Sequence, residues 1–225
     1  DKENSHARTG IFMIDASKGF MKDGAKNRLR AQDIHRINDT FTRQVEVAGY
    51  SRMVPLAEIG DPRNDFNLNL PRYIDSSEPE DLQDIDGHLR GGIPDGDIDA
   101  LGRYWEVLPA VRSALFEPVG RPGYSRLRMP AGEVKAAILG HPEFATFAAA
   151  ARASFAQWQA TNAPQLHGIQ VGDRPKALIE TLAEDLLASV RNAQVATRLI
   201  EPYDVYQHLL DYWAATMQDD VDLIS

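Results

Sequence analysis

The stretch TGIFMIDAS, residues 9–17, decides the expected fold of the first part of this chain. A short, unbroken apolar run that follows a glycine and ends in turn-forming residues is typical of a strand buried on both faces of a sheet. Such a strand needs neighbours, and only ten residues precede Ile11. A local sheet with residues 50–56 and 66–70 is one possible source of partner strands.

The next segments predict a helix and further extended structure. Apolar residues recur at spacings of three and four at Ile34, Ile37, Phe41 and Val45, which favours a helix that Gly49 ends. Residues 50–59 and 64–75 are expected to be extended. Within residues 66–70, apolar side chains alternate with asparagines, which is the period of a half-buried strand.

Residues 76–225 are expected to be helical. Ser77 and Glu80 fit a capping box for a helix that stops at Gly91-Gly92, and shorter helices are expected around residues 97–106 and 110–116. Asp173 is a candidate cap for a later helix. Three amphipathic stripes follow, and they predict a helix bundle, with each other or with a partner. The stripes are Phe144, Phe147, Ala151, Phe155 and Trp158; Leu178, Leu182, Leu186 and Val190; and Val205, Leu209, Tyr212 and Met217.

Composition limits the class of protein. The 225 residues carry a formal net charge of -9, which argues against strong nonspecific DNA binding by the whole chain. There is no cysteine, no secretory signal and no apolar run of the roughly 18 residues that cross a bilayer, so a cytoplasmic protein without a membrane partner is expected. Residues 15–36 are mainly basic and residues 75–99 mainly acidic, which suggests two surfaces with different partners or two solvated faces.

The sequence lacks the motifs of common active sites. It has no Gly-x-Gly, no phosphate-binding Gly-x-x-x-x-Gly-Lys, and its six histidines are scattered singly. Asp95, Asp97 and Asp99 loosely follow a calcium loop, but Ala100 stands where that loop needs glycine, so an acidic helix start explains them better. We therefore predict no catalytic, cofactor-binding or metal-binding residue in this chain.

Several segments together resemble one family. Residues 11–41 (IFMIDASKGFMKDGAKNRLRAQDIHRINDTF), 50–59 (YSRMVPLAEI) and 64–94 (NDFNLNLPRYIDSSEPEDLQDIDGHLRGGIP) are similar in order and spacing to the modification (methyltransferase) subunit of type I restriction–modification systems. The closing residues 204–224 (DVYQHLLDYWAATMQDDVDLI) look like the helical region of its longer members. The family's Asn-Pro-Pro-Phe-type motif and glycine-rich cofactor loop have no counterpart here, so no catalytic or cofactor residue carries over.

The resemblance implies a fold and a role. The family transfers a methyl group from S-adenosylmethionine to the N6 amine of adenine in DNA, and the target base is flipped out of the duplex. The opening strand then looks like a late strand of the methyltransferase sheet, and the chain is expected to be a piece of a longer protein. The expected fold is mainly α with a few short β-strands (α+β): residues 1–75 are the end of the catalytic domain, and residues 76–225 are a helical region.

The resemblance also implies partners. The helical region would dock on the specificity subunit, the nuclease subunit is a further candidate, and DNA would be bound through the full complex. The fragment alone is expected to be inactive and to hold no cofactor, while the parent protein uses S-adenosylmethionine. Candidate contacts to DNA phosphates are Lys18, Lys22, Lys26, Arg28 and Arg30, for which a solvated loop is the alternative. A freestanding α-helical interaction module without an enzymatic parent is the alternative to this whole interpretation.

Overall fold

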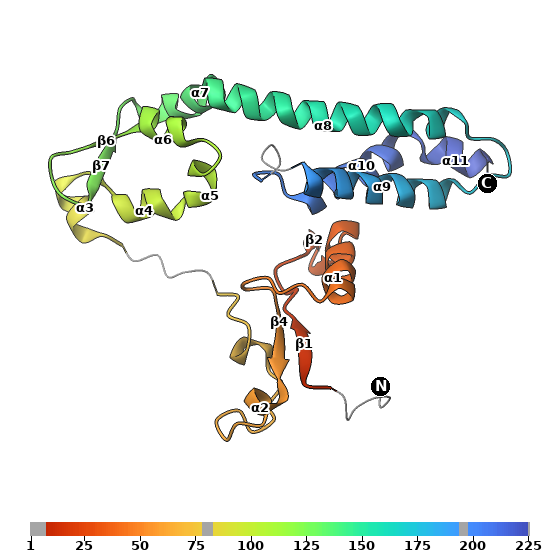
Figure 1. Cartoon of the computed structure of the whole chain (residues 1–225), viewed down its shortest axis with the longest axis horizontal. Helices are drawn as coiled ribbons and strands as arrows, with labels where there is room; N and C mark the ends of the chain where they lie inside the picture. The colour runs from red at the N-terminus through yellow and green to blue at the C-terminus, as the bar shows by residue number, and fades with distance from the viewer. Residues whose placement is uncertain (1–7, 78–82, 194–197, 225) are drawn as a thin grey trace. The chain divides into compact units, whose positions relative to one another are not determined.

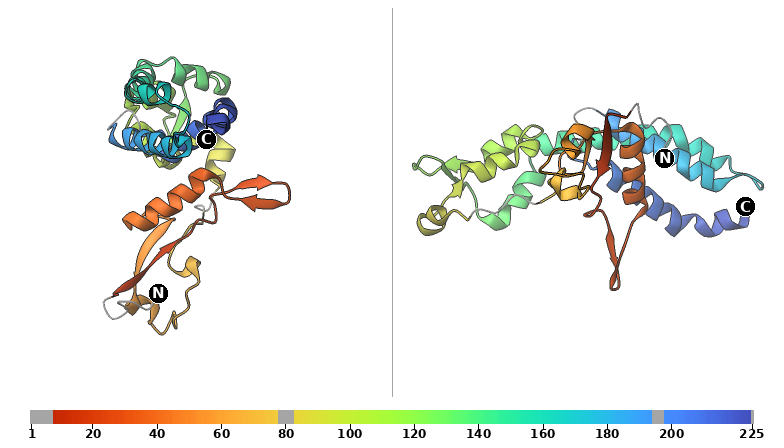
Figure 2. Two further views of the ribbon diagram at one scale, coloured as in Figure 1. Left: turned by 90° about the vertical axis from the view of Figure 1, so that its right-hand side faces the viewer. Right: turned by 90° about the horizontal axis from the view of Figure 1, so that it is seen from below.

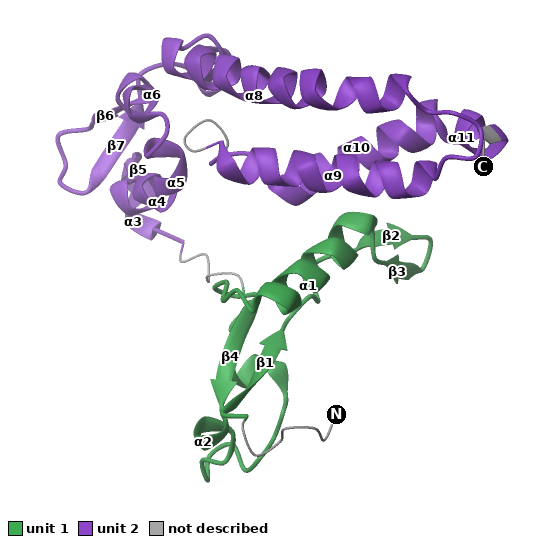
Figure 3. Cartoon of the chain, turned by 45° about the vertical axis from the view of Figure 1, so that its right-hand side comes forward, with its two compact units in different colours: residues 1–81 green, residues 82–225 purple. Residues whose placement is uncertain are grey.

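The computed structural model describes residues 8–77, 83–193 and 198–224, and it divides into two compact units, residues 1–81 and 82–225 (Figure 3). Short strands occur in both units, and helices make up most of the second, so the expected mainly α fold with a few short strands is confirmed. Each unit has its own buried apolar core.

The first unit begins with the expected strand. β1 (Gly10–Ile14) pairs antiparallel with β4 (Ser51–Pro55), with Phe12 opposite Met53. Residues 50–56 therefore do supply a partner strand. Only Met13 of β1 is buried, however, and Ile11 is 37% exposed. The apolar run predicted a strand that is covered on both faces. Within the described residues, β1 is not covered in this way.

Gly10 is required where β1 and β4 meet. A Cβ atom at this position would lie 2.6 Å from the backbone oxygen of Val54, closer than real Cβ atoms approach a backbone atom. Val54 itself is completely buried, in a core with Met13, Ile59, Tyr73 and Ile74. The glycine thus permits the close backbone approach on which this small core is built.

Between the two strands lie a hairpin and a helix. The hairpin consists of β2 (Met21–Asp23) and β3 (Lys26–Arg28), joined through Gly24, where φ is 61°. The basic segment, for which a solvated loop was the alternative, therefore contains two strands. α1 (Ala31–Arg43) is the expected helix, but it ends before Gly49, because Gln44 takes a left-handed conformation and its N–H bonds to the carbonyls of Phe41 and Thr40.

The predicted strand at residues 66–70 is wrong. Asp65 and Phe66 have positive φ angles of 45° and 56°, and the following residues form a turn and the 3-10 helix η2 (Leu70–Arg72). The Oδ1 atom of Asn67 accepts a hydrogen bond from the Asn69 N–H at 2.9 Å, so local side-chain bonding replaces a strand ladder. Ahead of this turn, the short helix α2 (Leu56–Ile59) follows β4 directly.

The second unit opens with a small α/β module (Figure 1). Its three-stranded antiparallel sheet has the order β5-β7-β6, and the sequence patterns did not predict these short strands. The helices nearest it are short, as expected for residues 97–106 and 110–116. The elements are α3 (Ile85–Arg90), β5 (Ile93–Pro94), α4 (Asp95–Ala100), α5 (Gly102–Trp105), α6 (Pro109–Leu115), β6 (Phe116–Pro118), β7 (Tyr124–Leu127), η3 (Ala131–Glu133) and α7 (Val134–Leu139).

Two of the predicted helix ends can be compared with α3. The Asp84 side chain caps the start of α3 by accepting a hydrogen bond from the Gly87 N–H at 2.9 Å, so α3 begins at Ile85, later than the start predicted at Ser77. Gly91 ends α3 with φ of 75°, and this end is as predicted. The proposed capping box at Ser77 and Glu80 extends beyond the described residues, because residues 78–82 are not described.

Long helices form the rest of the second unit. α8 (Pro142–His167), α9 (Pro175–Asn192) and α10 (Pro202–Thr216) run alternately up and down beside one another, and α11 (Gln218–Ile224) follows (Figures 1 and 3). The sequence predicted Asp173 as the cap of α9, and this prediction is wrong. The Oδ2 atom of Asp173 accepts instead from the Gln170 N–H at 2.7 Å, and Arg174 is the N-cap residue.

The apolar stripe of α8 packs in two separate cores. Near the start of the helix, Phe144 and Phe147 pack on a cluster around Leu108, Val111 and Leu115 of the small module. Farther along, the stripe enters a second cluster with α9 and α10. The buried members of this second cluster are Trp158, Ile179, Leu182, Leu186, Val190, Trp213 and Val221.

Candidate functional site

The five basic residues predicted to contact DNA fall into two groups. Lys22, Lys26 and Arg28 lie on the β2–β3 hairpin, which reaches away from β1 and α1 (Figure 2). Lys18 lies in the turn ahead of the hairpin, and Arg30 lies immediately before α1. All residues of the two hairpin strands are exposed. The hairpin therefore gathers three of the five cations on a projecting, solvated ribbon.

Side-chain contacts order the hairpin. The Lys22 Nζ donates to Asn27 Oδ1 at 2.7 Å across the strand pair. The Arg28 Nε lies 3.3 Å from an Asp23 carboxylate oxygen, with both side chains 62% exposed. Because Lys26 and Arg28 are two residues apart, they share one face of the ribbon, and Lys22 lies on the other. Exposed contacts of this kind are weak, so Lys22 and Arg28 can give up their present partners and bind phosphates instead at little cost in free energy.

Arg30 has a structural contact instead. Its Nε and Nη2 atoms donate to the two carboxylate oxygens of Asp33, both at 2.9 Å, and its backbone N–H donates to the same carboxylate at 2.8 Å. The side chain of Asp33 is only 6% exposed. Hydrogen bonding from Arg30 lowers the pKa of the Asp33 carboxyl below its ordinary value of 3.8. The pair fixes the first turn of α1, so Arg30 holds the helix at the base of the hairpin.

α1 presents its apolar side chains outward. Ile34 and Phe41 are 55% and 60% exposed, whereas Asp33 and Thr40 on the same helix are buried. The Arg36 guanidinium stacks over the Tyr50 ring with its carbon 4.2 Å from the ring centroid. Burial raises the pKa of the Tyr50 hydroxyl. An amphipathic helix normally buries its apolar face, so α1 has the pattern of a helix that packs against further structure.

The long helices enclose an apolar groove. It has a volume of about 700 Å³ and lies between α8 and α10, with Leu182 and Leu186 of α9 among its buried lining residues. On its rim, Phe155 and Tyr212 are 49% and 64% exposed. Most residues of the three predicted stripes pack on one another or on the small module, which is one of the two outcomes that the sequence left open. Phe155 and Tyr212 are exposed instead and flank the groove.

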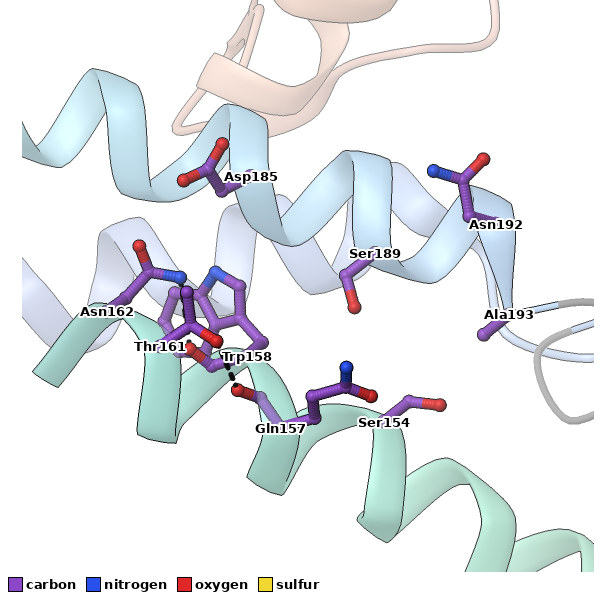
Figure 4. Close-up of a pocket in the computed structure, with 9 residues that line it drawn as sticks. All are labelled: Ser154, Gln157, Trp158, Thr161, Asn162, Asp185, Ser189, Asn192 and Ala193. Carbon is purple, nitrogen blue, oxygen red and sulfur yellow. Dashed lines mark hydrogen bonds between the residues drawn. The ribbon is translucent and has the colours of Figure 1, made fainter.

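The sequence patterns did not single out a second, polar cleft between α8 and α9, which Trp158 and Asn162 help to line. The sequence does contain a sign of this cleft. Asp185 and Ser189 are four residues apart on α9, and Ser154 and Trp158 are four apart on α8, so each pair lies on one face of its helix (Figure 4). Polar residues beside an apolar stripe are usually solvent-facing, so the pattern alone did not mark a cleft.

The acidic run that loosely follows a calcium loop has a structural role. Asp95 and Asp97 lie in the first turn of α4, and Asp95 accepts a hydrogen bond from the Ser125 hydroxyl at 2.6 Å. Among residues 8–77, 83–193 and 198–224, no group of acidic or histidine side chains is placed to hold a metal ion. In the same ranges, even α8 falls short of the apolar length that a bilayer crossing requires.

Comparisons with known proteins relate the first unit to DNA methylases. The family described as N-6 DNA Methylase matches residues 1–82. The methylase subunit of the type I restriction enzyme MpnII of Mycoplasma pneumoniae is 29% identical over 84 residues, which are 37% of this chain and 15% of the relative. The methylase subunit of the type I enzyme MjaVII of Methanocaldococcus jannaschii is 36% identical over 90 residues, 38% of this chain and 15% of the relative.

No solved structure shows a significant match to this chain. The resemblance to type I methylase subunits that the sequence predicted is confirmed, and the family match covers almost the same residues as the first compact unit. The chain spans only about 15% of the length of these relatives.

Proposed function

We propose that this chain works as part of a type I restriction–modification DNA methyltransferase, which transfers a methyl group from S-adenosylmethionine to the N6 amine of adenine. Residues 1–75 would belong to the catalytic domain and residues 76–225 to a helical region for subunit contacts. The observation that carries the proposal is the match of residues 1–82 to the N-6 DNA methylase family. The catalytic and cofactor-binding motifs would be contributed outside these 225 residues.

The surface of the first unit supports its place in a larger domain. A sheet of two strands is marginal by itself, and β1 and β4 form such a pair. The exposed Ile34 and Phe41 of α1 add apolar area that further structure would cover. Both features fit a segment that folds against the remainder of a methyltransferase domain.

The second unit supports a docking role. The groove between α8 and α10 has the form that an amphipathic helix fills, with apolar side chains at its floor and aromatic residues at its rim. Phe155 and Tyr212 are the exposed aromatic residues that such a helix would bury, and buried aromatics commonly dominate binding energy. The occupant we propose is a helix of the specificity subunit, and the nuclease subunit is a second candidate partner.

The hairpin supports a role beside DNA. Lys18, Lys22, Lys26 and Arg28 would contact phosphates of DNA held by the full complex, and such contacts position a protein without reading sequence. Arg30 was grouped with them on charge alone, but its guanidinium already bonds to Asp33. We therefore assign Arg30 to the support of the hairpin.

A binding experiment tests the docking role. Light scattering after size-exclusion chromatography should show a stable complex between this chain and the specificity subunit of its own system. Replacing both Phe155→Asp and Tyr212→Asp should weaken the complex about 1,000-fold, because aromatic hot spots cost about 2 kcal/mol or more each. The matched control is Val171→Asp, at a position 88% exposed outside the groove.

The outcomes separate the proposals. Unchanged binding by the double variant, with helical circular dichroism retained, would contradict the groove as the docking site. No binding by the folded wild-type chain would contradict the docking role. The alternative of a freestanding helical module predicts the groove as well, but it gives no reason for the methylase match of residues 1–82.

A further inference from the structure

The two-stranded sheet of the first unit has two outer edges, and they differ in what protects them. β1 and β4 run antiparallel side by side, with Ile11 opposite Val54 and Phe12 opposite Met53 (Figure 3). In an antiparallel pair, opposite residues that exchange hydrogen bonds alternate with opposite residues whose N–H and C=O groups point away from the partner strand. The alternation therefore decides which backbone groups each outer edge offers to a further strand.

Hydrogen bonds just beyond the two ends of the ladder show which residues are bonded across it. The Asp15 N–H donates to the Tyr50 carbonyl at 2.7 Å, and the Leu56 N–H donates to the Thr9 carbonyl at 2.9 Å. Counted from these bonds, every second residue of β1 is bonded to β4, and the residues between them direct their N–H and C=O groups to the outer edge. The outward-facing residues of β1 are Gly10, Phe12 and Ile14, and the residues opposite them on β4 are Pro55, Met53 and Ser51.

The outer edge of β4 is closed. The Ser51 N–H donates to the Val47 carbonyl at 2.9 Å, and the Met53 N–H donates to the Glu46 Oε1 atom at 2.8 Å. Pro55 has no N–H to donate. A proline, a charged side chain and a covering segment are devices by which natural proteins keep further strands from a sheet edge. Contacts within the described residues therefore leave no outward N–H of β4 for another strand.

The outer edge of β1 is open. Among the described residues, none accepts a hydrogen bond from the N–H of Phe12 or Ile14. β1 contains only glycine, isoleucine, phenylalanine and methionine, so it has neither a charged residue nor a proline. An apolar strand with unpaired backbone groups along its edge readily pairs with another strand. The sheet can therefore be extended beside β1 and not beside β4.

We propose that β1 is an interior strand of a larger sheet and that β4 is the strand at which this sheet ends. The partner of β1 would be an apolar strand of the same catalytic domain, outside the 225 residues, bonded to the N–H and C=O groups of Phe12 and Ile14. The chain spans only about 15% of the length of its relatives, so most of the proposed parent lies outside it and can supply this strand. An apolar partner fits because interior strands are commonly apolar on both faces. This choice of partner rests on the proposed function, whereas the difference between the two edges does not.

Amide hydrogen exchange tests the pairing, read residue by residue with mass spectrometry and electron-transfer fragmentation and corrected for intrinsic rates. In this chain alone, the Phe12 N–H should exchange at least about 100-fold faster than the Met13 N–H, because only Met13 is bonded to β4. In the full-length protein that we propose, the two rates should agree within about tenfold, because a partner strand then bonds Phe12 as well. The Met13 rate is the internal control, since a general gain in stability slows both amides alike.

A proline variant makes the test specific. Phe12→Pro removes the outward N–H, and Phe12→Ala is the matched control, because it removes the same ring and keeps the N–H. In the full-length protein, the Ile14 N–H should exchange at least about tenfold faster in Phe12→Pro than in Phe12→Ala, since the neighbouring bond to the partner strand is lost. In this chain alone, the two variants should give equal Ile14 rates. A slow Met13 N–H in both variants shows that β1 and β4 remain paired; if it is fast, the wild-type comparison alone decides.

The outcomes separate the pairing from the proposed function. Fast exchange of Phe12 and Ile14 in a full-length protein that methylates adenine in DNA with its specificity subunit would overturn the pairing and keep the proposed function. Slow exchange in a full-length protein without adenine methylation would keep the pairing and overturn the proposed function. Protection of Phe12 in this chain alone that rises with chain concentration would show that a second copy pairs with β1, and it would overturn the partner named above.

Discussion

Replacing two tryptophans by phenylalanine should affect stability in opposite ways. Trp158 and Trp105 both lie in the second unit, so both report on the unfolding of that unit. Trp105 donates a hydrogen bond to the Ile98 carbonyl and packs edge-on against Phe116, with ring centroids 6.0 Å apart. The indole N–H of Trp158 has no acceptor among the described residues.

The magnitudes follow from these contacts. Each change removes about 40 Å³ of ring volume, which costs about 1 kcal/mol if the space stays empty. Trp105→Phe also loses a hydrogen bond worth about 1 kcal/mol, so the free energy of unfolding should fall by about 2 kcal/mol. Trp158→Phe removes an unsatisfied donor whose burial costs about 1–3 kcal/mol, so its net effect should lie between about zero and a gain of 2 kcal/mol.

Urea denaturation followed by circular dichroism at 222 nm measures both values. The m-values should stay equal to that of the wild type, so that midpoint shifts report free energy. A loss for Trp158→Phe as large as that for Trp105→Phe would refute the reasoning, because it would mean that the Trp158 indole is hydrogen-bonded in the folded chain.

Three further predictions concern the first unit. Gly10→Ala should destabilise it by about 1–3 kcal/mol because the new Cβ meets the Val54 oxygen, and Gly132→Ala, with open space around it, should be nearly neutral in thermal denaturation. The pKa of Asp33 is lowered in the folded state, so the stability that its carboxylate gives α1 is present above about pH 4 and is lost as pH falls through that lowered pKa. Asp33→Asn should remove the loss of helicity on acidification that comes from this group. In the methyltransferase complex that we propose, Lys26→Ala should lower the slope of log affinity for nonspecific duplex DNA against log salt by up to about one, whereas Lys135→Ala should not; equal slopes for both variants would argue against the hairpin contact.

The long helices and the first strand pair were predictable because their patterns are long or strongly apolar. α8, α9 and α10 follow stripes of three and four spacing over many turns, and such patterns are the most reliable signal in a single sequence. β5, β6 and β7 contain two to four residues each, too few to show a period. They exist because the surrounding helices bring them together.

The errors have local physical causes. Residues 66–70 alternate like a strand, yet Phe66 is 72% exposed and left-handed, because asparagine side chains and the Tyr73 hydroxyl hold this segment in a turn. Asp173 has the chemistry of a cap, but its carboxylate bonds to the Gln170 N–H before it. The phosphate contact predicted for Arg30 from its charge stays a prediction, and no sequence pattern indicated the bidentate bond that the structure shows between Arg30 and Asp33.

The environment of the Trp158 indole was beyond reach of the sequence for a different reason. A pattern can place Trp158 on the inner face of α8, but it cannot say whether one nitrogen atom meets an acceptor. That question depends on the fit of α8 against α9, and the helices could cross in several ways with the same stripes.

Because α8 contributes apolar side chains to two cores, the rotation of one half of the helix relative to the other matters for packing. The helix has 26 residues, or about 39 Å of length, and its two halves pack in different cores. One residue inserted between Phe147 and Trp158 would rotate one half against the other by about 100°, although each core would keep all its own side chains. An insertion of seven residues would nearly restore the phase while lengthening the helix by about 10 Å. This helix therefore measures both a distance and a rotation between the cores, and changes in its length would be tolerated only in steps of whole turns.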